Sequence, residues 1–262
     1  MNNPRTYGTE PFKVALVHGG PGAPGEMAPV ARELADQYGV LEPLQTKASV
    51  TEQVEELRGL LKNHAQRPVT LVGYSWGAWL SCLCAARHPE LVAKLVLVSS
   101  APFTENYAAD VQMTRFARLS ADEREEVRTM MDAMKDPAAG DKDALLARFG
   151  ALFTKADACD PVTLESEGLE VRWDIHQSVW REAAQWRSSG RLLARVAAIQ
   201  CPVVALHGDH DPHPAEGVRV PLSETLSDFR LILLERCGHK PWIERHAATT
   251  FFAALRRELP QP

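Results

Sequence analysis

A serine between two glycines is the residue in this chain best suited to chemistry. Residues 73–77 read GYSWG, with a β-branched apolar run before them and helix-forming residues after them. A serine on a sharp turn between a strand and a helix needs small residues two positions to either side, because a Cβ there would collide with the turn. The serine hydroxyl then projects beside a helix N-terminus. Ser75 is therefore the candidate nucleophile.

Two later segments carry the groups that such a serine needs. A hydroxyl is a poor nucleophile until a base takes its proton, and that base must be held in one tautomer by a carboxylate. Residues 207–212 (HGDHDP) and residues 237–242 (CGHKPW) each follow a short apolar run. His239 lies between a glycine and Lys-Pro, a poor place for a histidine that is merely packed, so it is the candidate base. Asp209 and Asp211 are both candidates for the acid.

The order of these residues along the chain resembles the α/β-hydrolase superfamily. Serine, aspartate and histidine follow one another at the ends of three strand-like runs, and the resemblance covers nearly the whole chain apart from a central segment. In that superfamily the acid commonly stands last in a Gly-x-x-Asp stretch, which selects Asp211 over Asp209. The resemblance therefore implies a catalytic triad of Ser75, Asp211 and His239 at a nucleophile elbow.

A glycine-rich turn, residues 18–22 (HGGPG), follows the first apolar run. Acyl transfer builds a negatively charged oxygen in its tetrahedral intermediate, and such a turn can aim backbone N–H groups at it without side chains in the way. We expect the N–H groups of Gly20 and Trp76 to form this oxyanion hole, and His18 to support the turn. HGGPG together with Ser-Trp-Gly is similar to the proline iminopeptidase group, which removes N-terminal proline from peptides, although the same His-Gly turn opens many esterases.

The chain departs from that peptidase group in several ways. Tyr74 stands where the group typically has glycine, and only about a dozen residues precede the first apolar run. The two N-terminal strands usual in the superfamily are therefore expected to be absent or vestigial. An aminopeptidase would also need carboxylates from the central segment to hold a substrate ammonium group, although charge in such a segment is usually a solvated face. The available carboxylates are Glu165, Glu167, Glu170 and Asp174.

The elements that must position these residues can be read from hydrophobic patterns. Short apolar runs rich in β-branched residues predict buried parallel strands. These runs are Lys13–Val17, Val40–Leu44, Val69–Val72, Leu95–Val98, Val203–Leu206 and Arg230–Leu234. Helical patterns lie between them, the clearest beginning at Ser49, which has capping-box spacing to Glu52. The alternation predicts an α/β fold, a mostly parallel sheet with helices on both faces, with ligands bound beyond the carboxyl ends of the strands.

The alternation stops in the middle of the chain, where helical periodicity continues without a convincing strand. We predict an α/β-hydrolase core of residues 1–101 and 200–262, with a helical cap (lid) inserted at residues 102–199. The cap leaves the sheet after one strand and returns before the next, so it must lie over the carboxyl ends of the strands. We expect at least one of its three tryptophans to line the substrate pocket and bind the substrate. These are Trp173, Trp180 and Trp186.

Composition limits the classes of ligand. The 262 residues carry a formal net charge of −5 and no Lys/Arg-rich run, which argues against nucleic acid or an anionic membrane as the main partner. The uncharged run Pro68–Ala86 is long enough to span a membrane, but its glycines, serines and β-branched start favour a buried strand turning into a helix. The N-terminus has no apolar segment typical of a secretory signal, so we expect a cytoplasmic protein acting on a small-molecule substrate. The sequence leaves the oligomeric state open.

Cysteine and histidine are the residue types that most often bind transition metals, so their spacing bears on a metal site. The five cysteines are scattered and mostly in apolar surroundings, which suits buried thiols in a reducing compartment rather than zinc ligands or disulfides. A metal-binding interpretation of the loop that follows residue 206 is the weaker one, because neighbouring residues on one loop rarely converge on one ion. The residues concerned are His207, Asp209, His210, Asp211 and His213.

The sequence thus predicts a serine hydrolase of the α/β-hydrolase fold that cleaves a small ester or amide through an acyl-enzyme, with no metal and no cofactor. Four alternatives stay open. Three are enzymes of the same fold: an aminopeptidase similar to proline iminopeptidase, a hydrolase of carbon–carbon bonds, and a thioesterase. The fourth is a protein that keeps the fold and binds a ligand without chemistry.

Overall fold

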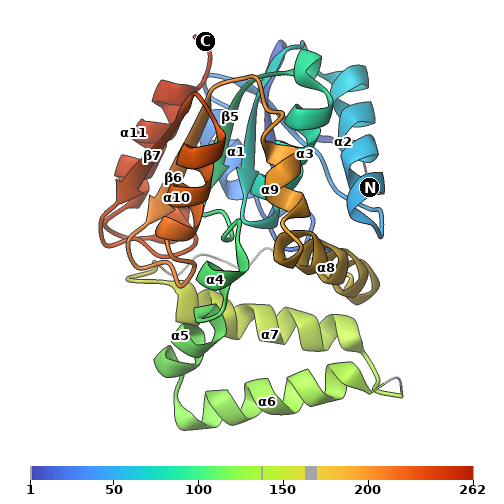
Figure 1. Cartoon of the computed structure of the whole chain (residues 1–262), viewed down its shortest axis with the longest axis vertical. Coiled ribbons are helices and arrows are strands. Elements are labelled where there is room, and N and C mark those ends of the chain that lie inside the picture. Colours follow the sequence, from blue (N-terminus) through green and yellow to red (C-terminus); the bar gives the residue numbers. More distant parts are fainter. Residues whose placement is uncertain (1, 137, 163–169, 262) are drawn as a thin grey trace.

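A seven-stranded sheet forms the centre of the computed structural model, which describes residues 2–136, 138–162 and 170–261 (Figure 1). The strand order is β1-β3-β2-β4-β5-β6-β7. Only the first strand runs antiparallel, paired with β3, and all other neighbours are parallel. This confirms the predicted fold class. The strands are β1 (Arg5–Tyr7), β2 (Phe12–Val17), β3 (Gly39–Glu42), β4 (Val69–Tyr74), β5 (Val92–Val98), β6 (Val203–Gly208) and β7 (Phe229–Leu234).

Helices cover both faces of this sheet (Figure 1). The core helices are α1 (Ala28–Leu34), α2 (Val50–His64), α3 (Trp76–Arg87), α10 (Glu216–Thr225) and α11 (Ala248–Glu258). The start of α2 is confirmed at the residue level, because the Ser49 hydroxyl accepts the Glu52 N–H at 3.3 Å. That bond satisfies one of the free N–H groups in the first turn of the helix.

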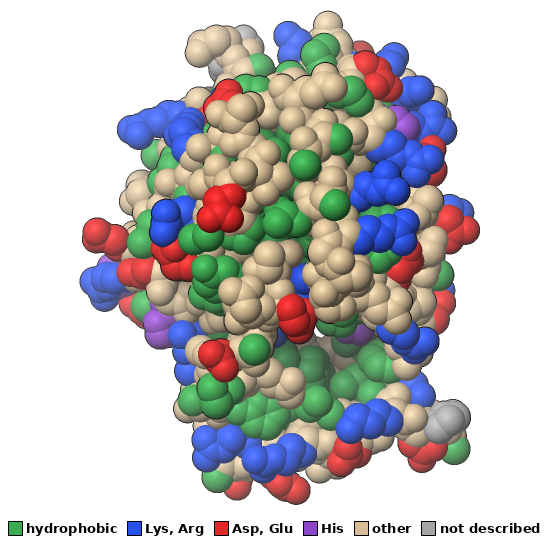
Figure 2. All heavy atoms as spheres, viewed as in Figure 1, with side chains coloured by type: hydrophobic (Ala, Val, Ile, Leu, Met, Phe, Trp, Pro, Cys, Tyr) green, Lys and Arg blue, Asp and Glu red, His purple; other side chains and the backbone are tan. Residues whose placement is uncertain are grey.

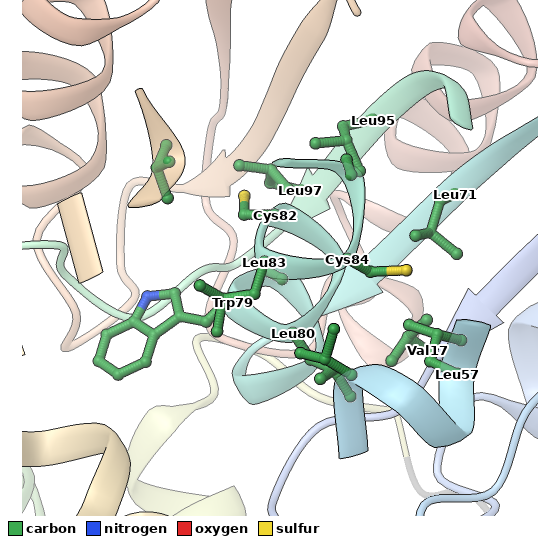
Figure 3. Packing of buried hydrophobic residues seen from close by; sticks show 14 of the residues in the cluster. Val17, Leu57, Leu71, Trp79, Leu80, Cys82, Leu83, Cys84, Leu95 and Leu97 are labelled. Carbon is green, nitrogen blue, oxygen red and sulfur yellow. The ribbon is translucent and has the colours of Figure 1, made fainter. Parts of the chain in front are cut away.

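Two hydrophobic layers hold the helices to the sheet. Successive strand side chains point to opposite faces, so alternate residues of one strand enter different layers. Val17 and Leu71 pack with α2, α3 and α9 on one face (Figure 3). Leu16 and Val72 pack against α1 and α11 on the other. Each aliphatic side chain buried in this way contributes roughly 1.5–3 kcal/mol, and the summed burial fixes the strand ends in space.

The segment between β5 and β6 folds as six helices in its described residues, with no strand beyond a single bridge between Pro161 and Glu244. They are α4 (Glu105–Ala108), α5 (Val111–Arg118), α6 (Ala121–Lys135), α7 (Lys142–Asp157), α8 (Trp173–Ser188) and α9 (Arg191–Val196). In Figure 1, α5, α6 and α7 form a layer of their own beyond one end of the sheet, while α8 and α9 lie against the core. We call α4–α9 the cap.

The N-terminal residues and the uncharged run Pro68–Ala86 both belong to the sheet region. One short N-terminal strand, β1, is present although no apolar run marked it; its three residues pair with β3 through Arg5 to Glu42 and Tyr7 to Val40. The uncharged run Pro68–Ala86 is β4 followed by α3, both almost wholly buried. Across the described ranges, no helix has the length and apolar character needed to span a membrane.

Candidate active site

The turn at Ser75 has the geometry that its sequence predicts. Ser75 lies between β4 and α3 with φ 51° and ψ −116°, a conformation that a non-glycine residue rarely adopts. A Cβ on Gly73 would lie 2.3 Å from the Gly77 carbonyl oxygen, and a Cβ on Gly77 would lie 2.3 Å from the carbonyl oxygen of Val17. Both glycines are therefore required by the close approach of backbone. The strained turn holds the hydroxyl of Ser75 at the carboxyl end of β4.

The structure joins Ser75, His239 and Asp211 in one chain of hydrogen bonds. His239 Nε2 lies 3.1 Å from Ser75 Oγ, and His239 Nδ1 lies 2.7 Å from Asp211 Oδ2. The three residues come from loops that follow β4, β6 and β7, which the parallel sheet brings to one edge. Tyr74 packs against the His239 ring at a centroid distance of 5.1 Å. This order of contacts suits proton transfer from the hydroxyl to the imidazole.

Asp211 and Asp209 lie in different surroundings. The Asp211 side chain is fully buried, whereas Asp209 is exposed and its Oδ1 accepts the Cys237 N–H at 3.0 Å. Burial by itself would raise the pKa of the Asp211 carboxyl, but His239 and His213 outweigh it and hold that pKa well below its usual range. Asp211 is therefore the carboxylate that faces His239 and stays ionised.

The glycine turn follows β2 and lies next to the Ser75 turn. Gly20 has φ +24°, in the region that favours glycine. Trp76 is the first residue of α3, where a backbone N–H has no partner within the helix. Its indole Nε1 donates to Gln53 Oε1 at 3.0 Å, which holds the start of the helix. The assignment of the Gly20 and Trp76 N–H groups to an oxyanion hole stays a prediction.

His18 is a buried support of this turn. Its Nε2 accepts the Gln45 N–H at 3.2 Å, and its Nδ1 lies 2.7 Å from the Gly19 carbonyl oxygen. The Nδ1 therefore carries the proton and donates it to that carbonyl. Burial lowers the pKa of His18 to about 4 despite this hydrogen bond. A neutral imidazole with both ring nitrogens in hydrogen bonds matches the structural role expected from the sequence.

The cap touches the His239 loop, residues 235–247, through residues 157–162, which we call the first cap contact. The carbonyl oxygen of Asp157 accepts the backbone N–H of His239 at 3.0 Å. The Asp157 carboxylate is held by Arg115 of α5 through two hydrogen bonds of 2.7 and 2.6 Å. The backbone of the candidate base is therefore bound by the cap as well as by the core.

A buried glutamate locks this first cap contact. The Glu244 side chain is fully buried and accepts three backbone N–H groups, from Cys159 at 2.8 Å, Asp160 at 2.8 Å and Gly238 at 2.9 Å. Two of these donors belong to the cap and one to the His239 loop. Glu244 was not singled out from the sequence, because it lies among charged residues such as Lys240 and Arg245 and no local pattern marks it as buried.

A second cap contact, residues 172–176, lies against the glycine turn. The Arg172 N–H donates to the Gly22 carbonyl oxygen at 2.7 Å, and His176 Nδ1 lies 3.1 Å from the Pro21 carbonyl oxygen. Gly22 has φ +79°, and a Cβ there would lie 2.3 Å from the Arg172 carbonyl oxygen. The cap therefore contacts both the His239 loop and the glycine turn, the two loops that the sequence predicts to be parts of the site.

The three cap tryptophans lie in different places. Trp180 stacks on Trp79 of α3 with ring centroids 6.0 Å apart and planes 7° apart, and Trp186 is buried in the same hydrophobic layer. Trp173 packs at the edge of the cap's own core, which α5, α6 and α7 form. Figure 2 shows a hollow between the core and the outer cap helices, bordered by hydrophobic side chains. Lining of a substrate pocket by these tryptophans stays a prediction.

The cap carboxylates do not form a described cluster near Ser75. Glu170 and Asp174 are exposed, and Asp174 pairs with Arg172 at 3.0 Å. Glu165 and Glu167 lie outside the described residues.

A surface groove of about 390 Å³ between β7 and α11 is lined by residues such as Ile232 and Arg257, and it shares no residue with the site described above.

The histidines proposed as weaker metal ligands are engaged in hydrogen bonds. Asp211, His213 and His239 bring ligand atoms within 4.8 Å of one another. The Nδ1 atoms of both histidines point at the Asp211 carboxylate, at 2.9 and 2.7 Å, so each serves as a donor there. His207 Nε2 lies 2.7 Å from the carbonyl oxygen of His213. These contacts form a hydrogen-bond network centred on the Asp211 carboxylate.

The described cysteines all carry free thiols. Cys82 and Cys84 are buried in α3, and burial raises the pKa of both thiols. A buried neutral thiol behaves as a small apolar side chain. This matches the packing role expected from the sequence.

Comparisons with known proteins agree with this architecture. A family model described as alpha/beta hydrolase fold matches residues 43–245. The chain is 28% identical over 256 residues to a pimeloyl-[acyl-carrier protein] methyl ester esterase of Chromobacterium violaceum, covering 94% of this chain and 93% of that protein.

Solved structures show the same fold at lower identity. VinJ is 19% identical with a TM-score of 0.65, covering 98% of this chain and 95% of VinJ. E-2-(acetamidomethylene)succinate hydrolase is 18% identical with a TM-score of 0.63, covering 97% of this chain and 93% of that one. Since the family model spans most of the chain and the fold agrees, the protein belongs to the α/β-hydrolase family.

Proposed function

We propose that this protein is a serine hydrolase that cleaves a small-molecule ester through an acyl-enzyme. The observation that carries the proposal is the hydrogen-bonded chain from Ser75 through His239 to the buried Asp211, with contacts of 3.1 and 2.7 Å. A histidine in that position takes the serine proton, and an ionised carboxylate fixes its tautomer. Asp211 is the buried, ionised carboxylate that this role needs, and Ser75 Oγ lies within hydrogen-bond distance of His239 Nε2.

In the proposed reaction, Ser75 Oγ attacks the ester carbonyl carbon while His239 Nε2 takes the hydroxyl proton. The resulting oxyanion is held by the N–H groups of Gly20 and Trp76. The tetrahedral intermediate collapses, the C–O bond to the leaving alcohol breaks, and His239 returns the proton to that alcohol. Water then attacks the acyl carbon while His239 takes its proton. The bond from that carbon to Ser75 Oγ breaks, the acid leaves, and His239 returns the proton to Ser75 Oγ.

Two observations favour an ester with an apolar acyl part. A curated relative that aligns with 94% of this chain is an esterase by name. The hollow between the core and the outer cap helices is bordered by hydrophobic side chains (Figure 2), which suits an apolar group and limits water near an acyl-enzyme. Amide, thioester and carbon–carbon substrates of the same fold remain the alternatives that a substrate panel must separate.

A covalent probe tests the reaction class. A fluorophosphonate should label Ser75, and Ser75→Ala should abolish labelling and turnover, because an activated serine beside an oxyanion hole is what such probes require. Ser188→Ala, an exposed serine of α8, is the matched control and should label fully. Folded wild-type protein that stays unlabelled would contradict the proposal and favour a protein that binds a ligand without catalysis.

A substrate panel tests the bond type. Aryl esters of increasing acyl chain length, an aryl thioester and proline p-nitroanilide should be compared at equal concentration. We expect the esters to be turned over fastest. Faster release from proline p-nitroanilide would favour the peptidase interpretation, which rests on the HGGPG and Ser-Trp-Gly motifs.

A further inference from the structure

Asp211 holds a second histidine besides His239. Its Oδ2 faces His239 Nδ1 at 2.7 Å, while its Oδ1 lies 2.9 Å from both the backbone N–H and the Nδ1 of His213. The His213 and His239 rings lie 4.5 Å apart between centroids with their planes 34° apart. His213 is therefore in direct contact with two members of the proposed triad, two residues along the chain from Asp211.

The protonation states around Asp211 allow one arrangement. The pKa of Asp211 is held well below its usual range, so the carboxylate accepts hydrogen bonds and donates none. Burial, together with the neighbouring His239, lowers the pKa of His213 to about 4 despite the carboxylate beside it. At neutral pH His213 is thus uncharged, and its single ring proton must be on Nδ1 for the 2.9 Å contact to be a hydrogen bond.

The His213 backbone is fixed from the other side. Its carbonyl oxygen lies 2.7 Å from Nε2 of His207, a fully buried residue at the end of β6. His213 itself is 7% exposed. Since both its backbone and its ring are held, His213 presents two donors to one oxygen of Asp211 and leaves the other oxygen facing His239.

We infer that His213 is a positioning residue for the proposed triad, whose Nδ1–H holds Oδ1 of Asp211 so that Oδ2 stays aligned with His239. The inference deepens the proposed function and rests on it. What matters for this role is a hydrogen-bond donor at the δ position of residue 213, and the volume of the ring matters less.

The donor also has an electrostatic effect that an experiment can follow. Each hydrogen bond to Asp211 spreads its negative charge and weakens its hold on a protonated His239. Removing the His213 donor should therefore favour protonated His239 and move the acid side of a pH–rate profile to higher pH. His207 lies 3.5 Å from Asp211, and Tyr74 packs on the His239 ring. The charge of Arg115, paired with Asp157, acts on His213, and Lys240, paired with Glu26, follows His239 in the chain. All of them are retained in the variants below.

Three variants separate a donor from a packing role. His213→Asn keeps an N–H donor at the δ position and loses the ring, whereas His213→Phe keeps a ring and loses the donor. His210→Phe is the matched control, since His210 lies on the same loop and its backbone N–H donates to the Cys237 carbonyl oxygen. The measurements are the second-order rate of fluorophosphonate labelling at Ser75 and kcat/KM for an aryl ester, both from pH 5 to 9, with Tm recorded for each variant.

We expect His213→Phe to lower the plateau labelling rate about tenfold and to move its half-maximal pH upward by about one unit, the size expected for loss of one hydrogen bond to a charged group. His213→Asn should stay within a few-fold of wild type with an unmoved profile, and His210→Phe should match wild type. If His213→Phe does not fold, His213→Gln takes its place, because its amide lies one bond too far from the backbone to replace Nδ1.

Other outcomes would overturn the inference. A Phe variant that behaves as wild type while the Asn variant loses activity would assign His213 a packing role. Wild-type profiles for both variants would show that Asp211 needs no second histidine. In either case a labelled, active wild type leaves the proposed function intact. Wild-type protein that is folded but neither labelled nor active would remove the proposed function and this inference with it.

Discussion

The loops at the carboxyl edge of the sheet and the outer helices of the cap use charge in opposite ways. In the loops, Asp211 and Glu244 are buried, and each accepts at least three hydrogen bonds. In the cap, α6 and α7 are joined by ion pairs at the surface, such as the 2.6 Å contact of Arg148 with Glu126. A buried carboxylate without donors is costly, whereas an exposed pair contributes little. Geometry at the site therefore depends on the few buried charges.

The two cap contacts differ in the same way. The first, at residues 157–162, is built on charged groups, the Glu244 carboxylate and the Arg115–Asp157 pair. The second, at residues 172–176, is built on a backbone hydrogen bond, a neutral histidine contact and the missing Cβ of Gly22. Changes in charge should therefore act at the His239 loop, and changes in shape at the glycine turn.

The largest effect is expected at the buried acid. Asp211→Asn should lower kcat about 10³- to 10⁴-fold, because an amide no longer stabilises the imidazolium and favours the wrong tautomer of His239. Asp209→Asn should lower it far less, since Asp209 is exposed and its described partner is the Cys237 N–H. Steady-state kinetics with an aryl ester measure both. The reverse order would mean that Asp209 orients the base.

A change of shape at the second cap contact should have the next largest effect. A methyl group on Gly22 would meet the Arg172 carbonyl at 2.3 Å, so Gly22→Ala should push the cap off the glycine turn and lower kcat by up to about 10²-fold. Gly190→Ala is the control, with a similar φ of +75° and open space around it. It should cost about 1–2 kcal/mol of stability from its backbone alone and leave kcat unchanged. Equal kcat losses would show that the clash is irrelevant.

The sequence predicts the core loops well because their signals are local. The strands are apolar runs, and Ser75 needs glycines two residues away on either side. The turn at residues 18–22 needs glycine as well, because a Cβ on Gly19 or Gly22 would collide with neighbouring atoms. Asp211 was preferred to Asp209 only through the family resemblance. The structure adds the burial and the contact with His239 that distinguish the two aspartates.

The cap contacts could not be predicted because they join residues far apart in the chain. Glu244 binds Cys159 and Asp160, more than 80 residues away, and no periodicity marks such a pairing. The N-terminal strands were expected to be absent or vestigial, and a single strand of three residues, β1, is present. Its bounds could not be predicted, because these residues are stabilised by pairing with β3 and form no apolar run of their own. His213 was noticed only as a possible metal ligand, since a sequence does not show which atom its ring faces.

A change of charge at the first cap contact comes third. Glu244→Gln keeps the shape and removes the negative charge that three N–H groups share, so it should destabilise the fold by roughly 1–3 kcal/mol and lower kcat about tenfold through the His239 backbone. Glu126→Gln, which breaks an exposed pair with Arg148, is the matched control and should leave both Tm and kcat near wild type. Thermal melts and kinetics at one pH distinguish them. Equal losses would contradict the contrast between buried and surface charge.

The smallest effect is expected at the cap tryptophans, where the substrate itself is the reporter. Trp180 and Trp186 pack into the core layer, so their replacement by Ala should lower Tm more than it changes specificity. Trp173 lies at the edge of the cap core, and its backbone N–H donates to Asp143 Oδ1 at 2.7 Å, which fixes the start of α8. Trp173→Ala should change KM for long-chain aryl esters a few-fold while leaving short-chain esters and Ser75 labelling unchanged.

A panel of acyl chain lengths measures that preference for each of the three variants at a temperature where all are folded. If only Trp173→Ala alters it, the cap shapes the pocket through the residues at the edge of the cap's own hydrophobic core, in line with the hollow seen in Figure 2. If none alters it, the cap acts through its two contacts with the loops alone, and the pocket is formed by the loops of the sheet. The second result would mean that the loops of the sheet carry both the chemistry and the substrate specificity, while the cap only holds these loops in position.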